Sequence, residues 1–102
     1  MHLREVGRHV VVHAPAKLNL FFEVLDRRSD GFHEVETLVY PINLCDTVII
    51  RERSDERIEF RVSCVSERAL GEIPADSSNL VVRAVSLLRR EGRHNQGADI
   101  LL

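Results

Sequence analysis

The 102-residue sequence contains few of the features that mark specialised classes of protein. No run approaches the roughly 20 apolar residues of a membrane-spanning helix, and charged residues interrupt the N-terminus where a secretory signal would be apolar. The formal net charge is −2, so no positive excess indicates binding to nucleic acid or to an anionic membrane. Repeats, low-complexity tracts and Gly- or Ser-rich linkers are also absent. The remaining composition, 44% hydrophobic and 29% charged, predicts a soluble, cytoplasmic chain that forms one domain or part of one.

Cysteine and histidine are too sparse to indicate a disulfide or a metal centre. Cys45 and Cys64 form no CxxC pair, and we expect both to be reduced, buried thiols. The five histidines are scattered, and no two of them have a convincing spacing for metal ligands. We therefore predict no metal site from the side chains of this chain.

Hydrophobic alternation predicts that the first two thirds of the chain is mainly extended. Pro15 should end the first strand or form a bulge. Pro41 should place the far end of the strand over 34–44 at a sheet edge or in a bend. Residues 54–57 are expected to form a hairpin loop. Strands are expected over residues 10–12, 18–24, 34–44, 47–50 and 58–64.

The last third of the sequence predicts a loop over 66–78, a helix and one more strand over 98–102. Ser78 or Asn79 can cap the helix, and Gly92 can end it. Four apolar residues at positions i, i+3, i+4 and i+7 predict one apolar face of this helix: Val81, Ala84, Val85 and Leu88. The predicted fold class is α+β, a mostly antiparallel sheet of about five or six strands with one packed helix.

Four residues in the first third form the candidate site. Lys17 and Asn19 are two residues apart in a predicted strand, so both point to the same face. A turn at Asp30-Gly31 then returns the chain, and we expect it to bring Phe32 and His33 beside Lys17. A cation, an amide, a flat ring and an imidazole suit a phosphorylated or nucleotide-like ligand. Taken singly, each has an ordinary interpretation: a surface lysine, a polar residue on a wet sheet face, a core phenylalanine and a surface histidine.

The same residues belong to a longer pattern. Its pieces are Pro15-Ala16-Lys17-Leu18-Asn19-Leu20, Arg28-Ser29-Asp30-Gly31-Phe32-His33, Thr37-Leu38, Asp46-Thr47 and Asn79-Leu80-Val81. In order and spacing the pattern resembles the N-terminal part of the 4-diphosphocytidyl-2-C-methyl-D-erythritol kinase family, in the GHMP kinase superfamily, over about residues 13–102. The resemblance implies that residues 1–102 are the N-terminal part of a GHMP kinase domain (ribosomal protein S5 domain 2-like).

The resemblance also implies an activity and a role for each site residue. Such kinases use ATP and Mg²⁺ to phosphorylate a hydroxyl of a cytidine-diphosphate-linked polyol in isoprenoid precursor synthesis. Lys17 would be the catalytic residue beside that hydroxyl, and Asn19 would hydrogen-bond the polyol. Phe32 would stack on the cytosine ring and His33 would read its polar edge. Asn79 would lie near the adenine of ATP.

Two departures from the family pattern bear on activity. Family members usually carry tyrosine at the position of Phe32, and phenylalanine keeps the stacking face. The glycine-rich phosphate loop expected after the strand at 100–102 is missing, as is the catalytic aspartate beyond it. The resemblance therefore implies a truncated kinase that is inactive alone. The alternative is a non-catalytic module for cytidine-nucleotide binding or assembly.

We also expect the chain to associate with itself. Apolar surface and bare strand edges favour a homodimer or higher oligomer, with the contact around residues 98–102 or at a neighbouring sheet edge.

Overall fold

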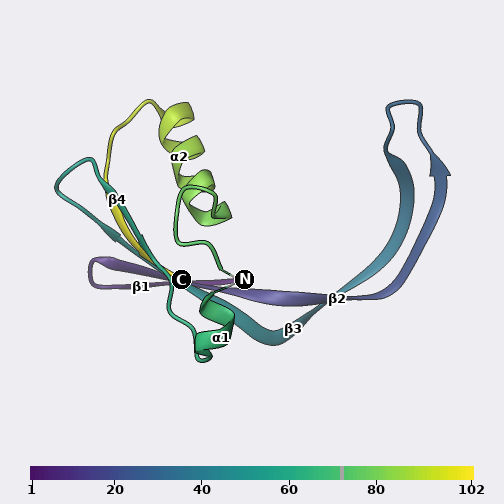
Figure 1. Ribbon diagram of the computed structural model, residues 1–102, viewed down its shortest axis with the longest axis horizontal. Helices are drawn as coiled ribbons and strands as arrows, with labels where there is room; N and C mark the ends of the chain where they lie inside the picture. The colour runs from purple at the N-terminus through teal and green to yellow at the C-terminus, as the bar shows by residue number, and fades with distance from the viewer. Residues whose placement is uncertain (72) are drawn as a thin grey trace. The chain divides into compact units, whose positions relative to one another are not determined.

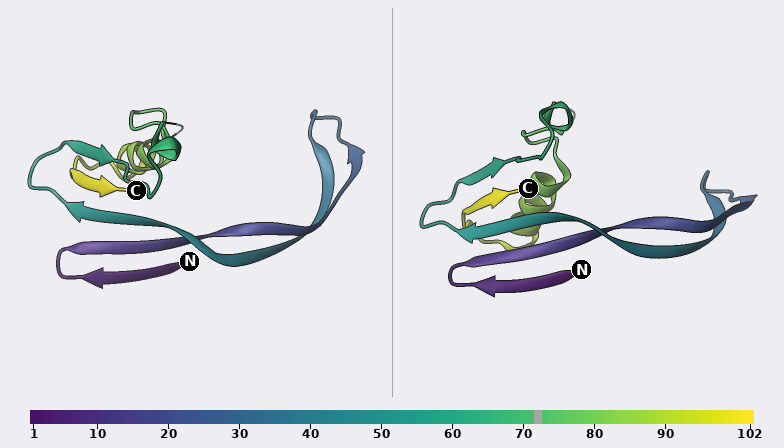
Figure 2. Two further views of the ribbon diagram at one scale, coloured as in Figure 1. Left: turned by 60° about the horizontal axis from the view of Figure 1, so that its bottom comes forward. Right: turned by 90° about the horizontal axis from the view of Figure 1, so that it is seen from below.

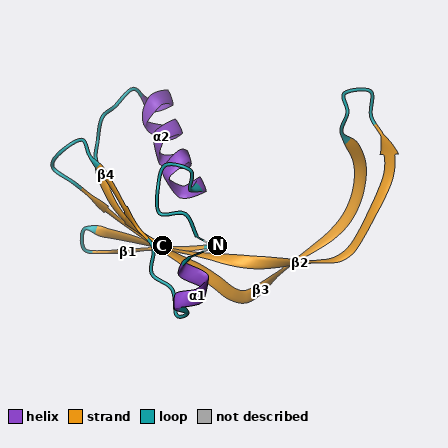
Figure 3. Cartoon of the chain, in the orientation of Figure 1, coloured by secondary structure: helices purple, strands orange, loops and turns teal. Residues whose placement is uncertain are grey.

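The structure is a computed structural model that describes residues 1–71 and 73–102 (Figure 1). Five strands form one sheet in the order β1-β2-β3-β5-β4. The elements, coloured by type in Figure 3, are β1 (His2–Val6), β2 (His9–Arg27), β3 (His33–Glu52), β4 (Ile58–Arg61), α1 (Glu67–Leu70), α2 (Leu80–Gly92) and β5 (Ala98–Leu101). The predicted α+β class, a mainly antiparallel sheet with a packed helix, is confirmed.

The chain divides into two compact units. Unit 1 contains residues 1–13 and 47–102, and unit 2 contains residues 14–46. The strands β2 and β3 are long enough to contribute residues to both units. None of the described helices combines the length and hydropathy that a membrane crossing requires.

The first strand was missed from the sequence. β1 pairs antiparallel with β2, and Val6 faces His9 across a two-residue turn. Gly7 has φ +62° in that turn, and a glycine with positive φ at the first loop position is what a type II′ hairpin requires. The Gly7-Arg8 dipeptide, which stands before the apolar run at 10–12, was the available signal.

The hydrophobic core lies in unit 1, around β5. Ile100 is only 1% exposed and is the one hydrophobic residue in the described chain that is fully buried. Half-buried apolar side chains lie on other elements of unit 1: Val10, Val11, Val12, Val48, Ile49, Ile50, Ile58, Phe60, Val81, Val82 and Val85. Burial is thus concentrated where β5 meets the other strands.

The position of β5 corrects two predictions. Ile50 pairs with Ile100 on one side of β5, antiparallel, and Phe60 pairs with Ile100 on the other side, parallel. Residues 54–57 are therefore not a hairpin loop, because β5 is inserted between β3 and β4. Residues 98–101 are not an open edge for self-association either, because both sides of that strand are already paired; Figure 2 shows the three strands from two further sides.

Glycine at position 97 allows β5 to enter the sheet. The Gly97 N–H donates to the Asp55 carbonyl oxygen (3.0 Å), and the Gly97 carbonyl oxygen accepts the Arg53 N–H (3.0 Å). A Cβ at this position would lie 2.6 Å from the Arg57 carbonyl oxygen and would also collide with the backbone of Asp55. Only a residue without a side chain lets the loop before β4 approach β5 this closely.

An ion-pair network fixes the same region. The Arg53 guanidinium donates to carboxylate oxygens of Asp55 and Asp99, both at 2.6 Å, and Arg51 donates to Asp99 at 2.7 Å. The hydrogen bond from Arg53 is the main cause of a lowered pKa for Asp55. Hydrogen bonds from Arg51 and then Arg53 lower the pKa of Asp99. Both carboxylates also hold the pKa of Arg53 above its usual range.

Pro15, predicted to end a strand or form a bulge, lies inside a strand instead, because β2 runs without a break through it. Pro41, predicted to lie at an edge or a bend, lies within β3. Both residues fall within unit 2, which contains only β2 and β3, so each strand there has one edge without a neighbour. A missing N–H costs no ladder bond on such an edge, which explains why the strands continue.

The helix α2 begins as predicted and ends differently. Asn79 is its N-cap, and its side-chain oxygen accepts the Val81 N–H. Gly92 is the last helical residue, while the left-handed C-cap is Arg93 with φ 52°. The half-buried residues of the helix are Val81, Val82, Val85 and Arg89, whereas Ala84 and Leu88 of the predicted apolar face are exposed.

Candidate functional site

Unit 2 is a two-stranded ribbon that exposes apolar side chains on both of its faces. Only Ala14, Pro15 and Ile42 are half-buried in it, and all other residues are exposed. Alternation along β2 puts Leu20 and Phe22 on one face and Phe21 on the other, but all three are similarly open to solvent. Burial does not alternate because nothing in the described chain packs on the ribbon. The free sulfur of Cys45, predicted to be buried, is exposed here too.

Lys17 and Asn19 lie on β2 within this ribbon, and both are exposed. The strand is continuous through them, so their side chains share one face as the two-residue spacing predicts. Their neighbour Phe21 is tied across the ribbon, since the Thr37 hydroxyl donates to the Phe21 carbonyl oxygen (2.8 Å). A cation and an amide are thus displayed together on a strand that has a fixed partner.

Phe32 and His33 lie at the tip of the same ribbon, where β3 begins. Phe32 is 72% exposed. Its N–H donates to the Asp30 carboxylate (3.0 Å), and its carbonyl oxygen accepts the Arg28 N–H (2.6 Å). His33, the first residue of β3, is exposed beside it. An open aromatic face with a firmly bonded backbone is suited to stacking on a flat ring.

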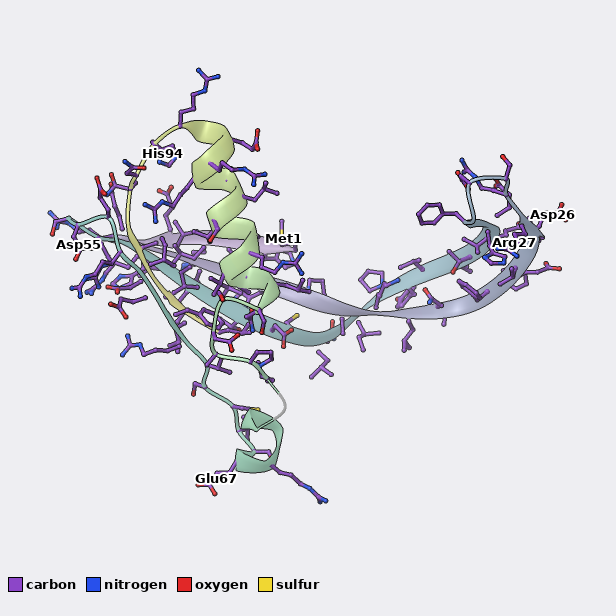
Figure 4. All side chains as sticks on the ribbon, turned by 45° about the horizontal axis from the view of Figure 1, so that its top comes forward. Met1, Asp26, Arg27, Asp55, Glu67 and His94 are labelled. Atoms are coloured by element: carbon purple, nitrogen blue, oxygen red, sulfur yellow. The ribbon has the colours of Figure 1, made fainter. Side chains whose placement is uncertain are left out.

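The register of the ribbon separates the two halves of the predicted site. The bond between Arg28 and Phe32 places Phe32 opposite Arg28, and not beside Lys17 as expected from the sequence. Ten residues of β2 separate Lys17 from Arg27, a contour of about 33 Å at the usual rise per residue. The far end of the ribbon curves strongly, as Figure 1 shows, and Figure 4 marks Asp26 and Arg27 there. Lys17 and Phe32 therefore lie at different positions along the ribbon, and its curvature makes the straight distance between them shorter than the contour length.

Asn79 lies in unit 1 and is 7% exposed. Its side-chain oxygen caps α2, and its amide N–H donates to the Pro74 carbonyl oxygen (2.8 Å). These two bonds join the loop before α2 to the first turn of the helix. The structure therefore gives Asn79 a role in starting the helix.

Two cavities are found in unit 1, and neither of them is lined by a predicted site residue. The larger, about 860 Å³, lies between α2 and the sheet, with Val85 and Leu88 on one side and Ile50 and Ala98 on the other. The smaller, about 450 Å³, lies against Ile49 and Leu101. The candidate site on unit 2 is an exposed surface.

Sequence reasoning missed residues that form side-chain bonds at the tip of unit 2 and, separately, within unit 1. Arg28 and Asp30 bond around Phe32, and the preference of aspartate for accepting the N–H two residues later was the available signal for Asp30. His13 Nδ1 and Thr47 Oγ1 lie 3.1 Å apart, in unit 1 next to the boundary with unit 2. That pair is 34 positions apart in sequence, and no local pattern indicates it.

Comparison with known proteins identifies relatives for most of the chain. No family model matches it. The 4-diphosphocytidyl-2-C-methyl-D-erythritol kinase of Alkaliphilus metalliredigens is 35% identical over 95 residues, 93% of this chain and 31% of that protein. The kinase of the same name from Ralstonia nicotianae is 43% identical over 89 residues, 87% of this chain and 28% of that protein.

A solved structure agrees with these relatives. The crystal structure of a 4-(cytidine 5'-diphospho)-2C-methyl-D-erythritol kinase matches with a TM-score of 0.67 and 32% identity. The match covers 89% of this chain and 30% of the solved chain, in its N-terminal part. The chain thus spans about three tenths of the length of the relatives that it matches.

Proposed function

Because the chain belongs to the 4-diphosphocytidyl-2-C-methyl-D-erythritol kinase family, we propose that it carries the acceptor-side part of a kinase site. The acceptor named for its relatives combines a cytosine ring, a diphosphate and a polyol. Such a molecule has different chemical groups at its two ends, which suits the placement of Lys17 and Phe32 at different positions along the ribbon.

Each site residue then has one role. Phe32 stacks on the cytosine ring, and His33 hydrogen-bonds the polar edge of the base. Lys17 lies at the acceptor hydroxyl, where its positive charge stabilises negative charge on that oxygen. Asn19, on the same face, hydrogen-bonds the polyol.

ATP and Mg²⁺ are implied by the family, but the described residues do not fit them. In residues 1–71 and 73–102, no group of three histidine, cysteine, aspartate or glutamate side chains could hold a metal ion. Asn79, the residue expected near adenine, is almost fully buried, and both ends of its amide are bonded within the chain. We therefore derive no phosphoryl-transfer step, and expect these 102 residues alone to be inactive as a kinase.

The observation that best supports the proposal is the open ring of Phe32 on a bonded backbone. Titration of the chain with cytidine 5'-diphosphate tests it directly. Base–aromatic stacking is worth roughly 1–3 kcal/mol by alanine substitution, so Phe32→Ala should weaken binding about 5- to 150-fold. Phe22→Ala is the matched control, an exposed aromatic on the same ribbon, and should leave binding unchanged. Equal losses in both variants would overturn the proposal.

A second candidate function, a non-catalytic assembly module, is favoured by the exposed area. The chain exposes 8611 Å², whereas a compact monomer of its 11.7 kDa mass exposes about 5,900 Å². Much of the excess is apolar and lies on unit 2, where Leu20, Phe22 and Tyr40 are open to solvent. A homodimer formed through these faces or through the outer strands β1 and β4 would cover it.

A further inference from the structure

The tip of unit 2 is closed by three hydrogen bonds over five residues. The Arg28 N–H donates to the Phe32 carbonyl oxygen (2.6 Å), and the Gly31 N–H donates to the Arg28 carbonyl oxygen (3.1 Å). The Phe32 N–H donates to Asp30 Oδ1 (3.0 Å). Both backbone groups of Phe32 are therefore hydrogen-bonded, the N–H to Asp30 and the carbonyl oxygen to Arg28.

The Asp30 carboxylate joins the two sides of this turn. While Oδ1 accepts the Phe32 N–H, Oδ2 lies 2.8 Å from an Nη atom of Arg28. The other Nη atom of Arg28 lies 3.6 Å from Glu34, on the strand that leaves the turn. The Arg28 backbone thus hydrogen-bonds Phe32, and the Arg28 side chain forms ion pairs with Asp30 and Glu34, which lie on either side of Phe32 in the sequence.

Gly31 makes this geometry possible through its conformation. Its φ is +89°, which residues with a side chain rarely adopt, and a Cβ there would meet no atom within 4 Å. Glycine is therefore needed for the backbone angle, and not to leave space for a neighbour. The chain reversal at Gly31 brings the Phe32 N–H onto the carboxylate of Asp30, two residues earlier.

The Phe32 ring is 72% exposed, so the described chain covers little of it. Order at this position must therefore come mainly through the backbone. A binding group that is already ordered before the ligand arrives loses less conformational entropy on binding.

We propose that Asp30 and Arg28 are positioning residues that hold Phe32 ready to stack on a cytosine ring, an inference that rests on the proposed function. Asp30 has the larger role, since its carboxylate bonds Phe32 directly. The Arg28 side chain acts through Asp30, and half-exposed ion pairs of this kind contribute little by themselves.

The test uses the 102-residue chain, cytidine 5'-diphosphate and nuclear magnetic resonance. Stacking on Phe32 should move the cytosine H5 and H6 signals upfield. Asp30→Ala should reduce that shift and weaken binding about two- to tenfold, the loss expected for one net hydrogen bond. Asp30→Asn keeps an acceptor for the Phe32 N–H and should restore most of both effects. Asp26→Ala, which removes a nearby carboxylate without a hydrogen bond or ion pair in the described chain, should change neither.

The outcomes separate this inference from the proposed function. If Phe32→Ala leaves nucleotide binding unchanged, the proposed function fails. If Phe32→Ala weakens binding while Asp30→Ala does not, only the positioning role is overturned. If the chain does not bind the nucleotide at all, the proposed function fails and the positioning role that rests on it fails with it. In a chain that binds, hydrogen exchange at the Phe32 N–H is a second measurement: faster exchange in Asp30→Ala than in wild type supports the positioning role, and unchanged exchange refutes it.

Discussion

Replacing Gly97 by alanine should destabilise unit 1 strongly, since the new methyl group has no space. It would lie 2.6 Å from the Arg57 carbonyl oxygen and 2.9 Å from the Arg57 nitrogen, and it would also collide with the Asp55 carbonyl oxygen. All of these atoms belong to the backbone, so no side chain can rotate away. The loop before β4 must move off β5 instead.

The cost follows from what that movement breaks. Three backbone bonds join the two segments, two at Gly97 and one from the Ala98 N–H to the Arg57 carbonyl oxygen. The substitution should break or weaken these bonds, or strain the backbone that keeps them. Either effect should lower the free energy of unfolding by about 2–4 kcal/mol. For a domain of this size that lowers Tm by about 10–25 °C.

Thermal unfolding followed by circular dichroism measures this effect. The matched control is Gly71→Ala, where a Cβ would have one neighbour, the Arg68 carbonyl oxygen at 3.9 Å. That variant should change stability by no more than about 0.5 kcal/mol. A Gly97→Ala protein that melts within about 2 °C of wild type would refute the close approach between the loop and β5.

Three further predictions follow from the charges, the composition and the exposed surface. Because Arg53 helps to hold the pKa values of Asp55 and Asp99 below those of the unfolded chain, the stabilisation they provide is complete above about pH 5 and is lost as pH falls further. Urea midpoints at pH 7 and pH 3 should show this loss, and Asp99→Asn should reduce it; equal losses in both proteins would contradict the assignment. The chain alone should release no ADP from ATP, Mg²⁺ and the cytidine-diphosphate polyol, and release above that of Lys17→Ala would disprove this. Light scattering should show a dimer or larger species, whereas a monomer at all concentrations would remove the case for assembly.

Local patterns in the sequence were enough to predict much of the secondary structure. Asn79 has the side chain that a helix N-cap needs, and the Asp30-Gly31 pair predicts the turn that the structure shows. The family pattern was also visible in short motifs, and the relatives confirm it.

Features that depend on distant parts of the chain could not be predicted in the same way. The insertion of β5 between β3 and β4 pairs residues 40 to 52 positions apart, and no local preference specifies it. The prediction that Pro15 ends a strand was wrong, because the effect of a proline depends on whether a neighbouring strand needs the missing N–H. The prediction that Phe32 lies beside Lys17 was wrong in register, because Phe32 is bonded to Arg28, beyond the end of the 19-residue strand β2.

The measurement that tests the central claim most directly is the activity of a chimeric kinase. In it, this chain replaces the matching 89 residues of the Ralstonia nicotianae relative, which supplies the rest of the enzyme. If the chain carries the acceptor-side part of the site, the chimera should release ADP when given ATP and the cytidine-diphosphate polyol. Lys17→Ala in the chimera should lower kcat on the order of 100-fold, as expected for the loss of one electrostatic partner of the transition state. A folded chimera without activity, or one that Lys17→Ala leaves equally active, would contradict the claim.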